Sequence, residues 1–298
     1  MNNNLGRDKL PWSQNLWDRI DQSVHDEMQR ILIDRRFVPV VPMADALTVP
    51  ADTITTSDGL LEINEASITE VIEIWVEFAL TKQQVEGEMD LSSAVTLATR
   101  ATNLLAQGED LLVNQGNDVI KNNELFTDGR IHTRAGPGPA GLANKAALPD
   151  PGKQVIPVRF SDKPRRKYGE NTFGAVSLAY ARLQKRGHYG PYALELPTEP
   201  NADTRAPLAD TLIMPADRII PLVDGRLYGT GTLPEQPDLL GVMVSLGGNS
   251  IDMVVSRDAT TAFVQEDNEG LYRFRVFERF ALRDKDPTSR ILLEFQQA

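Results

Sequence analysis

Hydrophobic positions first repeat with a helical period over residues 13–35. Ser13 can cap the start of this helix, and Asp18 lies in the first turn, where the helix dipole favours a negative charge. The apolar side chains recur at steps of three and four residues, at Trp17, Ile20, Val24, Met28, Ile31 and Leu32. The pattern predicts an amphipathic helix whose apolar face covers either the chain's own core or a groove that also receives a partner.

The next stretch does not have the pattern of a core strand. Residues 37–50 mix β-branched side chains with three prolines, Pro39, Pro42 and Pro50. Proline cannot donate within a central ladder, so we expect an edge-like or projecting segment. Residues 51–70 are polar around the turn Ser57-Asp58-Gly59, which predicts a long hairpin with no core of its own. A loop of this length usually contacts something else.

The remaining pattern mixes helices and strands without a regular alternation. Residues 72–80 alternate between apolar and other side chains and predict a half-buried strand. Residues 91–114 predict a helix of about 36 Å, with Asp90 or Ser92 as cap and Gly116 beyond its end. Residues 129–171, rich in Gly, Pro and charge, predict a loop or insertion. Further helices are expected at 172–185 and 208–214, and strands at 192–196, 226–228, 240–246, 251–255, 260–264, 272–282 and 291–295. This order favours an α+β fold over a doubly wound one.

Composition narrows the class of protein. The chain has 298 residues, of which 41% are hydrophobic and 24% charged, as is typical of a soluble globular protein. It lacks an apolar run of the ~18 residues that a membrane span needs, and its start has no signal-peptide pattern, so we expect a cytoplasmic protein without a membrane partner. The absence of cysteine excludes disulfides, thiolate metal sites and Cys nucleophiles. A net charge of -11 makes nucleic acid an unlikely partner.

Local motifs give no concentrated catalytic or cofactor site. Gly136, Gly138 and Gly141 spell G-x-G-x-x-G, but intervening prolines remove backbone donors from the loop that would hold a pyrophosphate. The three histidines, His25, His132 and His188, have no metal-ligand spacing, and no nucleophile elbow or P-loop is present. One basic cluster, residues 163–167, predicts a solvated or subunit-contacting loop, with an RNA or nucleotide contact as the alternative.

The order of several short motifs resembles that of the encapsulins, the nanocompartment shell proteins with the tailed-bacteriophage capsid fold. The matching segments are Trp17 to Asp21, Ile33 to Val38, Glu73 to Leu80 followed by Asp90 to Ser93, Gly190 to Leu194, Pro207-Leu208, Gly247-Gly248 and Leu271 to Leu282. The resemblance covers nearly the whole chain except residues 120–171, a segment longer than is usual in the family.

The resemblance implies a fold with a peripheral domain, an axial domain and an extended loop that reaches a neighbouring subunit. The expected division is an N-terminal helix and arm of the peripheral domain at 1–45, the extended loop at 46–71, the peripheral domain with its spine helix at 72–130, the axial domain at 131–245 and the peripheral sheet at 246–298. The implied function is that of a non-enzymatic subunit of an icosahedral cage.

The resemblance also implies a groove for the C-terminal targeting peptide of a cargo protein. Trp17, Ile20, Val24, Met28 and Leu32 would line or support this groove, with Arg35 at its edge and Asp258 on the facing strand. Pro39, Ala259 and Thr261 depart from the family pattern and predict a shallower groove. Gln83 replaces the flavin-stacking Trp of some relatives, so we expect no bound flavin or other cofactor.

A pore loop at residues 200–208 is implied as well, with Asp203 and Arg205 setting its charge. Ferritin-like proteins and dye-decolourising peroxidases are the implied cargo classes. Two other functions remain open: a phage-type capsid protein, which the acidic charge disfavours because a genome-lining surface needs Lys and Arg, and a soluble oxidoreductase with catalytic groups drawn from distant loops.

Overall fold

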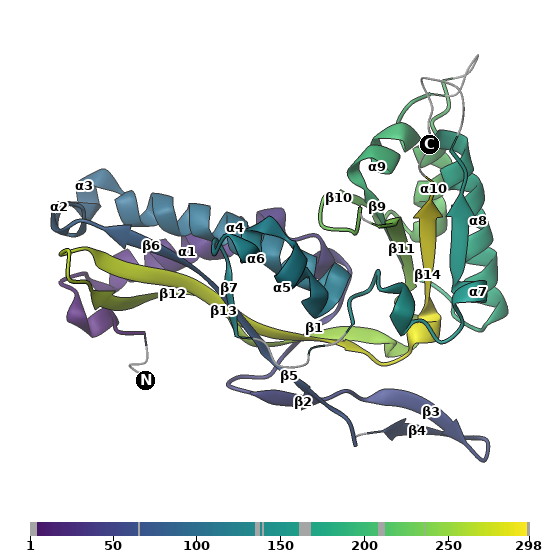
Figure 1. The fold of residues 1–298 in the computed structure, drawn as a ribbon, viewed down its shortest axis with the longest axis horizontal. Coiled ribbons are helices and arrows are strands. Elements are labelled where there is room, and N and C mark those ends of the chain that lie inside the picture. Colours follow the sequence, from purple (N-terminus) through teal and green to yellow (C-terminus); the bar gives the residue numbers. More distant parts are fainter. Residues whose placement is uncertain are drawn as a thin grey trace.

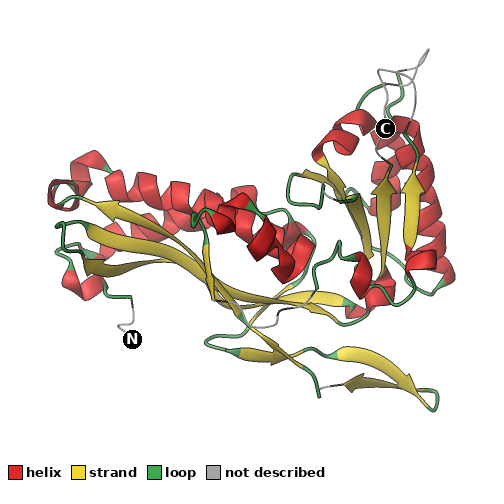
Figure 2. Ribbon diagram, viewed as in Figure 1, coloured by secondary structure: helices red, strands yellow, loops and turns green. Residues whose placement is uncertain are grey.

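A computed structural model describes residues 5–64, 66–134, 138, 140–160, 168–207, 212–235 and 237–296. Two five-stranded sheets, each covered by helices on one face, lie at an angle to one another, and a thin two-stranded arm projects below them (Figures 1 and 2). The mixed architecture confirms the expected α+β class. None of the helices in the described part of the chain has the length and hydrophobicity of a membrane span.

The first sheet has the strand order β1-β12-β13-β6-β7. Its strands are β1 (Val40–Pro42), β6 (Ile72–Leu80), β7 (His132–Arg134), β12 (Ile251–Glu266) and β13 (Tyr272–Asp284). Only β1 is parallel to its neighbour, and it lies at the edge of the sheet, as the prolines of this segment predict. The strand expected at 72–80 is confirmed, whereas those expected at 251–255 and 260–264 are one strand whose register shifts around Arg257.

Two long helices cover one face of this sheet (Figure 1). The first, α1 (Gln14–Ile31), begins at Ser13, whose hydroxyl accepts from the Leu16 N–H. It ends four residues earlier than expected, because Leu32 leaves the helical conformation and a 3-10 helix, η2 (Asp34–Arg36), follows. The second, α4 (Ser93–Gln115), ends at Gly116 as expected. Small helices flank it: α2 (Lys82–Glu86), α3 (Glu88–Leu91), η3 (Gly116–Asp118), α5 (Val119–Asn122) and α6 (Glu124–Thr127).

The helix α4 is not capped by the Asp90 or Ser92 side chain, contrary to expectation. Ser92 stands at the cap position but has a φ of 52°, and its hydroxyl accepts no hydrogen bond from the helix. The Glu88 carboxylate accepts from the Ala94 and Val95 N–H groups instead, at 2.7 and 3.2 Å. An acidic side chain near a helix start satisfies the same unpaired amides as a serine cap does.

The extended hairpin, residues 46–71, lies on the opposite face of the first sheet (Figure 1). Its base pairs β2 (Thr48–Pro50) with β5 (Ile68–Glu70), and a small apolar cluster of Val49, Val254 and Ala281 joins that base to the sheet. Its outer part pairs β3 (Thr53–Ser57) with β4 (Leu60–Asn64). Asp58 and Gly59 both have positive φ, 50° and 80°, as a type I′ turn requires. The predicted hairpin is therefore confirmed.

The second sheet has the order β10-β9-β11-β14-β8. Its strands are β8 (Val155–Val158), β9 (Tyr192–Pro197), β10 (Leu227–Thr230), β11 (Leu239–Ser245) and β14 (Arg290–Phe295). Helix α8 (Gly169–Lys185) packs on one face, with α9 (Thr198–Thr204), α10 (Pro215–Ile219) and η5 (Ile220–Val223) nearby. The helix expected at 208–214 is wrong for 212–214, which are not helical; residues 208–211 lie outside the described part of the chain.

The order of strands in space differs from the expected division in two places. The last strand, β14, pairs with β11 and β8 of the second sheet, although residues 246–298 were expected to stay in the first. Conversely, β7 pairs with β6 of the first sheet. The expected loop at 129–171 also contains β8, α7 (Pro151–Gln154) and η4 (Lys145–Ala147). These short elements gain their pairing from tertiary contacts, which a local pattern does not report.

The two sheets share a core where they meet. The main apolar cluster unites α1, α4 and the first sheet with residues from the second sheet, namely Ala193, Leu240, Val242, Val244 and Leu292. A separate cluster fills the space between α8 and the other face of the second sheet. The chain is therefore one packed body with a joint between its two sheets.

Candidate functional site

A groove of about 430 Å³ lies between the end of α1, the 3-10 helix η2 and strand β12. Seven residues line it: His25, Met28, Gln29, Leu32, Arg35, Arg36 and Asp258. Met28, Leu32, Arg35 and Asp258 are four of the seven groove residues expected from the sequence. The structure therefore brings the end of the first helix and the facing strand together around a cavity.

The other three expected residues do not line the groove. Trp17, Ile20 and Val24 are at most 2% exposed and belong to the main core. Trp17 packs against Trp12 and Phe274, with ring centroids 4.9 and 6.4 Å apart. For these three residues, the apolar face of the helix covers the chain's own core and not a groove for a partner. Met28 and Leu32, each 3% exposed, form the narrow apolar floor.

Arg35 is the central charge of the groove. Its guanidinium forms ion pairs with Glu109 on α4 at 2.6 Å, with Glu278 on β13 at 2.8 Å and with Asp258 at 2.8 Å. Burial by itself would lower the pKa of Arg35, but the adjacent carboxylates outweigh it and hold the pKa above its ordinary value. Arg35 is therefore fixed in place by its ion pairs.

Glu109 and Glu278 were not predicted as site residues from the sequence. Both side chains are fully buried, and burial together with the neighbouring Glu109 raises the pKa of Glu278 well above its usual range. A signal existed, because Glu278 shares the core-facing side of its strand with Phe274, Val276 and Phe280. An acidic residue at such a position requires a partner.

The rim of the groove is polar. His25 lies 3.9 Å from Asp258, and its Nε2 is 2.7 Å from the Gln29 amide. Arg36 donates to the Arg30 carbonyl at 2.8 Å and makes no ion pair within the described residues. A ligand here would meet a small apolar floor, an acidic group at one wall and an exposed arginine.

The two expected pore residues differ in environment. Asp203 lies at the end of α9 and accepts at 3.1 Å from the N–H of Tyr168, the residue just before α8. Its carboxylate therefore joins two helices of the second sheet. Arg205 follows α9 and is exposed. The expected loop at 200–208 is helical up to Thr204, and Leu208 lies outside the described residues.

The other candidates from the sequence lie apart from the groove. Gln83 is exposed on α2, His132 stacks on Trp75, and His188 lies 2.8 Å from the Thr288 hydroxyl. Among the described residues, no group of three or more His, Cys, Asp or Glu side chains is arranged to hold a metal ion. The basic cluster at 163–167 and Gly136 are outside the described part of the chain.

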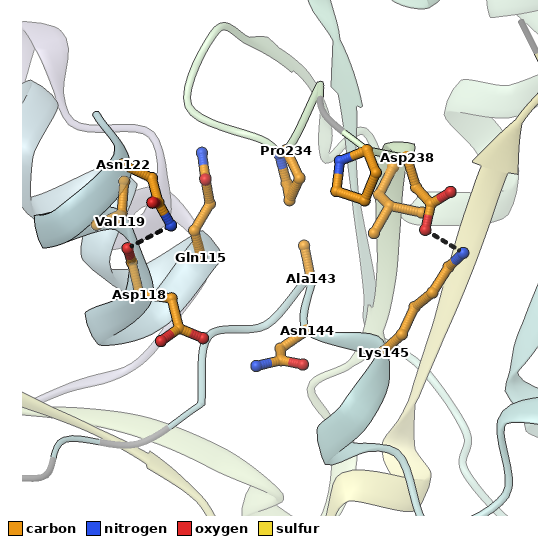
Figure 3. A pocket seen from close by; sticks show the side chains of 11 residues that line it. Gln115, Asp118, Val119, Asn122, Ala143, Asn144, Lys145, Pro234 and Asp238 are labelled. Atoms are coloured by element: carbon orange, nitrogen blue, oxygen red, sulfur yellow. Dashed lines mark hydrogen bonds and ion pairs between the residues drawn. The ribbon is translucent and has the colours of Figure 1, made fainter. Parts of the chain in front are cut away.

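A second cavity, of about 300 Å³, lies at the joint between the two sheets, where residues after α4 face the loop before β11 (Figure 3). Lys145 lies at its edge and pairs with Asp238 at 2.6 Å and with Glu294 at 2.5 Å. Because Lys145 and its two carboxylate partners form ion pairs with one another, we interpret this cavity as part of the packing between the two sheets.

Most of the chain matches the model of a known protein family. Residues 1–126 and 157–281 match the model of a family described as encapsulating protein for peroxidase. The interval between the two matched parts, 127–156, lies within the segment 120–171, which the resemblance did not cover; residues 282–298 are also outside the match. The type 1 encapsulin shell protein EncA of Myxococcus xanthus is 25% identical over 306 residues, which cover 97% of this chain and 96% of that protein.

Solved structures agree on the fold. A virus-like particle from Pyrococcus furiosus superimposes with a TM-score of 0.67 at 16% identity, covering 94% of this chain and 99% of the other. The capsid of Myoviridae phage XM1 gives a TM-score of 0.57 at 10% identity, with 89% and 92% covered. The expected tailed-phage capsid fold is thus confirmed.

Proposed function

Because this chain belongs to the family of encapsulating proteins for peroxidase, the encapsulin shell proteins, we propose that it assembles with copies of itself into a closed icosahedral cage that encloses a cargo protein. In this proposal the subunit is structural and not catalytic. Small solutes would pass through pores near the end of α9, where Arg205 is exposed.

The observation that carries the assembly proposal is the extended hairpin. Leu60, Leu61 and Ile63 are 66%, 79% and 61% exposed in the isolated chain. Apolar side chains exposed together on a projecting ribbon usually mark a surface that another chain covers. Contacts between unlike surfaces of identical subunits close into a shell when symmetry permits.

Substitution of Ile63 tests the assembly proposal. Ile63→Asp places a charge on the apolar side of the hairpin, and we expect hollow particles to be lost in negative-stain microscopy and size-exclusion chromatography. Ile63→Val is the matched control and should assemble as the wild type does. Because the side chain is exposed, circular dichroism of both variants should match the wild type. Particles of wild-type size and yield from Ile63→Asp would contradict a hairpin-mediated contact.

The groove at the end of α1 is our proposed cargo site, receiving a C-terminal targeting peptide. Its apolar floor of Met28 and Leu32 and its charged rim suit a short peptide with apolar anchors and polar ends. Methionine suits this surface because its flexible thioether adapts to different ligands. A floor of two apolar side chains favours a peptide with few apolar anchors.

Filling the groove from its rim tests this assignment without disturbing the core. Gln29→Trp places a large ring in the cavity, whereas Gln22→Trp adds the same ring two turns earlier on the same exposed side of α1. A fluorescent reporter fused to the C-terminal segment of a ferritin-like protein or a dye-decolourising peroxidase serves as cargo. We expect Gln29→Trp to reduce co-purification of the reporter with the cage, and Gln22→Trp to leave it unchanged. Equal loading of both variants would refute the groove assignment.

A phage-type capsid protein that packages nucleic acid is the alternative consistent with the fold. The net charge of -11 disfavours it. The ratio of absorbance at 260 and 280 nm of purified particles separates the two, because packaged nucleic acid raises it strongly.

A further inference from the structure

Three buried carboxylates from three separate elements meet at the joint between the two sheets. Asp34 in η2, Asp110 in α4 and Glu195 in β9 are 0%, 2% and 1% exposed. We call them the acidic triad. None of them lines the groove, and Asp110 borders a different cavity. The proposed cage and cargo functions do not use them.

The strand alternation explains why Glu195 points into this joint. Along β9, Tyr192, Leu194 and Leu196 contribute to the cluster under α8, whereas Ala193 contributes to the cluster shared with α1 and α4. Glu195 lies two residues from Ala193 and therefore faces the same way. Glu195 is thus an acidic residue on the side of the second sheet that faces α1 and α4.

Hydrogen bonds link the triad to the end of α1. The Asp110 carboxylate accepts from the Ile33 N–H at 3.1 Å and from the Asp34 N–H at 3.3 Å. Asn114 on α4 donates to Asp34 at 3.3 Å and to the Thr232 hydroxyl at 3.4 Å. Glu195 faces Asp34 and Asn114, but neither of its oxygens makes a hydrogen bond of ordinary geometry within the described residues.

The charged groups around the triad are acidic. Glu109, next to Asp110 on α4, adds a further carboxylate. Arg35 follows Asp34 in the chain, but its guanidinium is bound to Glu109, Glu278 and Asp258. Within the described chain, no hydrogen bond or ion pair joins a Lys or Arg to the triad, and no metal-binding arrangement is present. Three buried carboxylates without a cation cannot all be ionised, so protons must take the place of counter-ions.

We propose that Asp34, Asp110 and Glu195 form a proton-dependent latch that holds the second sheet against α4 and the end of α1. With protons bound, the carboxyl groups can hydrogen-bond with one another across the joint. When the protons leave, mutual repulsion of the carboxylates loosens it. The latch lies within one chain, so the proposal does not depend on whether the chain forms a cage.

The direction of the pH effect follows from the protonation of each group. Burial raises the pKa of Asp110 to about 7 and that of Glu195 to about 8, and burial with the nearby Glu195 raises the pKa of Asp34 well above its usual range. The folded chain therefore binds more protons here than the unfolded chain at neutral pH. The contribution of the acidic triad to the free energy of unfolding is full below about pH 4 and is lost as the pH rises through about 7 to 8.

Proton release on unfolding measures this directly in the full-length protein. From the pKa values of Asp110 and Glu195 and the direction for Asp34, we expect the triad of the wild type to release about two protons when the chain is unfolded with guanidinium at pH 7. Glu195→Gln should release about one proton fewer, because the amide cannot titrate. Glu269→Gln is the matched control; Glu269 is exposed, so folding changes its surroundings little, and it should release as many protons as the wild type.

Asp34→Asn repeats the test with a second member of the triad, should Glu195→Gln fail to fold. Equal proton release from the wild type and from a folded triad variant would overturn the proposal. The opening itself is measured by amide hydrogen exchange at Ile33 and Asp34, corrected for intrinsic rates. Between pH 6 and pH 9 we expect protection in the wild type to fall about tenfold, and to change less in Glu195→Gln. Unchanged wild-type protection over this range would also overturn it.

Discussion

Two acidic clusters lie side by side in this molecule and differ by one guanidinium. Asp34 and Arg35 are consecutive, and so are Glu109 and Asp110, yet each pair divides between the clusters. Arg35 and Glu109 belong to the groove cluster with Glu278 and Asp258. Asp34 and Asp110 belong to the acidic triad. Consecutive residues of η2 point to different sides, so one backbone segment supplies a cation to one cluster and a carboxyl to the other.

The comparison teaches how a protein keeps buried carboxylates in place. In the groove cluster Arg35 forms ion pairs with all three carboxylates and offsets part of their charge, although burial and the neighbouring Glu109 still raise the pKa of Glu278. In the triad, with no cation among its described contacts, protons take that role, and the cluster becomes sensitive to pH. Equal burial thus leads to different behaviour, and the difference depends on the position of Arg35.

Removing Arg35 should have the largest effect. Arg35→Met leaves Glu109 and Glu278 buried without their cation, and we expect a loss of about 3–5 kcal/mol in the free energy of unfolding. Denaturant unfolding monitored by tryptophan fluorescence measures it. Arg36→Met is the matched control on the next residue, where the side chain is exposed, and should cost no more than about 0.5 kcal/mol. Similar losses in both variants would show that the groove cluster does not depend on its arginine.

The pH profile of stability should show the next largest effect. Because the pKa values of Asp110 and Glu195 are raised to about 7 and about 8, the wild-type free energy of unfolding should fall as the pH rises from 5 to 9. This fall should persist at high salt, since buried groups are poorly screened. Melting temperatures of the wild type and Glu195→Gln across this range provide the measurement. A profile with the same slope in both proteins would assign the pH dependence to other groups.

Much of the framework of these clusters was predictable from the sequence. The apolar repeat placed α1 and α4, and the alternation at 72–80 placed a strand of the first sheet. The end of α1 was not predictable, because the amides of Ile33 and Asp34 are satisfied by the Asp110 carboxylate on a different helix. No local pattern reports such a contact.

The candidate site was predictable in part for a similar reason. The helical repeat indicated an apolar face, but it could not show which of its positions pack in the core and which line the groove. Trp17, Ile20 and Val24 are buried in the core. Glu278 and Glu195 were detectable in principle as acidic residues within apolar strands. Their neighbours come from helix α4 and from residues 34 and 35, and only the folded chain brings these segments together.

Asp258 should show the smallest effect on stability and thereby separates the support of the groove from its binding role. Its side chain is 54% exposed, so its ion pair with Arg35 is well solvated, and Asp258→Asn should cost less than about 1 kcal/mol. Arg35 keeps Glu109 and Glu278, so the cluster should survive the substitution. The groove, however, loses an acidic wall, and loading of the reporter cargo should fall if the peptide places a cation there. Unchanged loading with unchanged stability would limit the role of Asp258 to the edge of the arginine cluster and leave Arg36 as the charged group of the rim that a peptide meets.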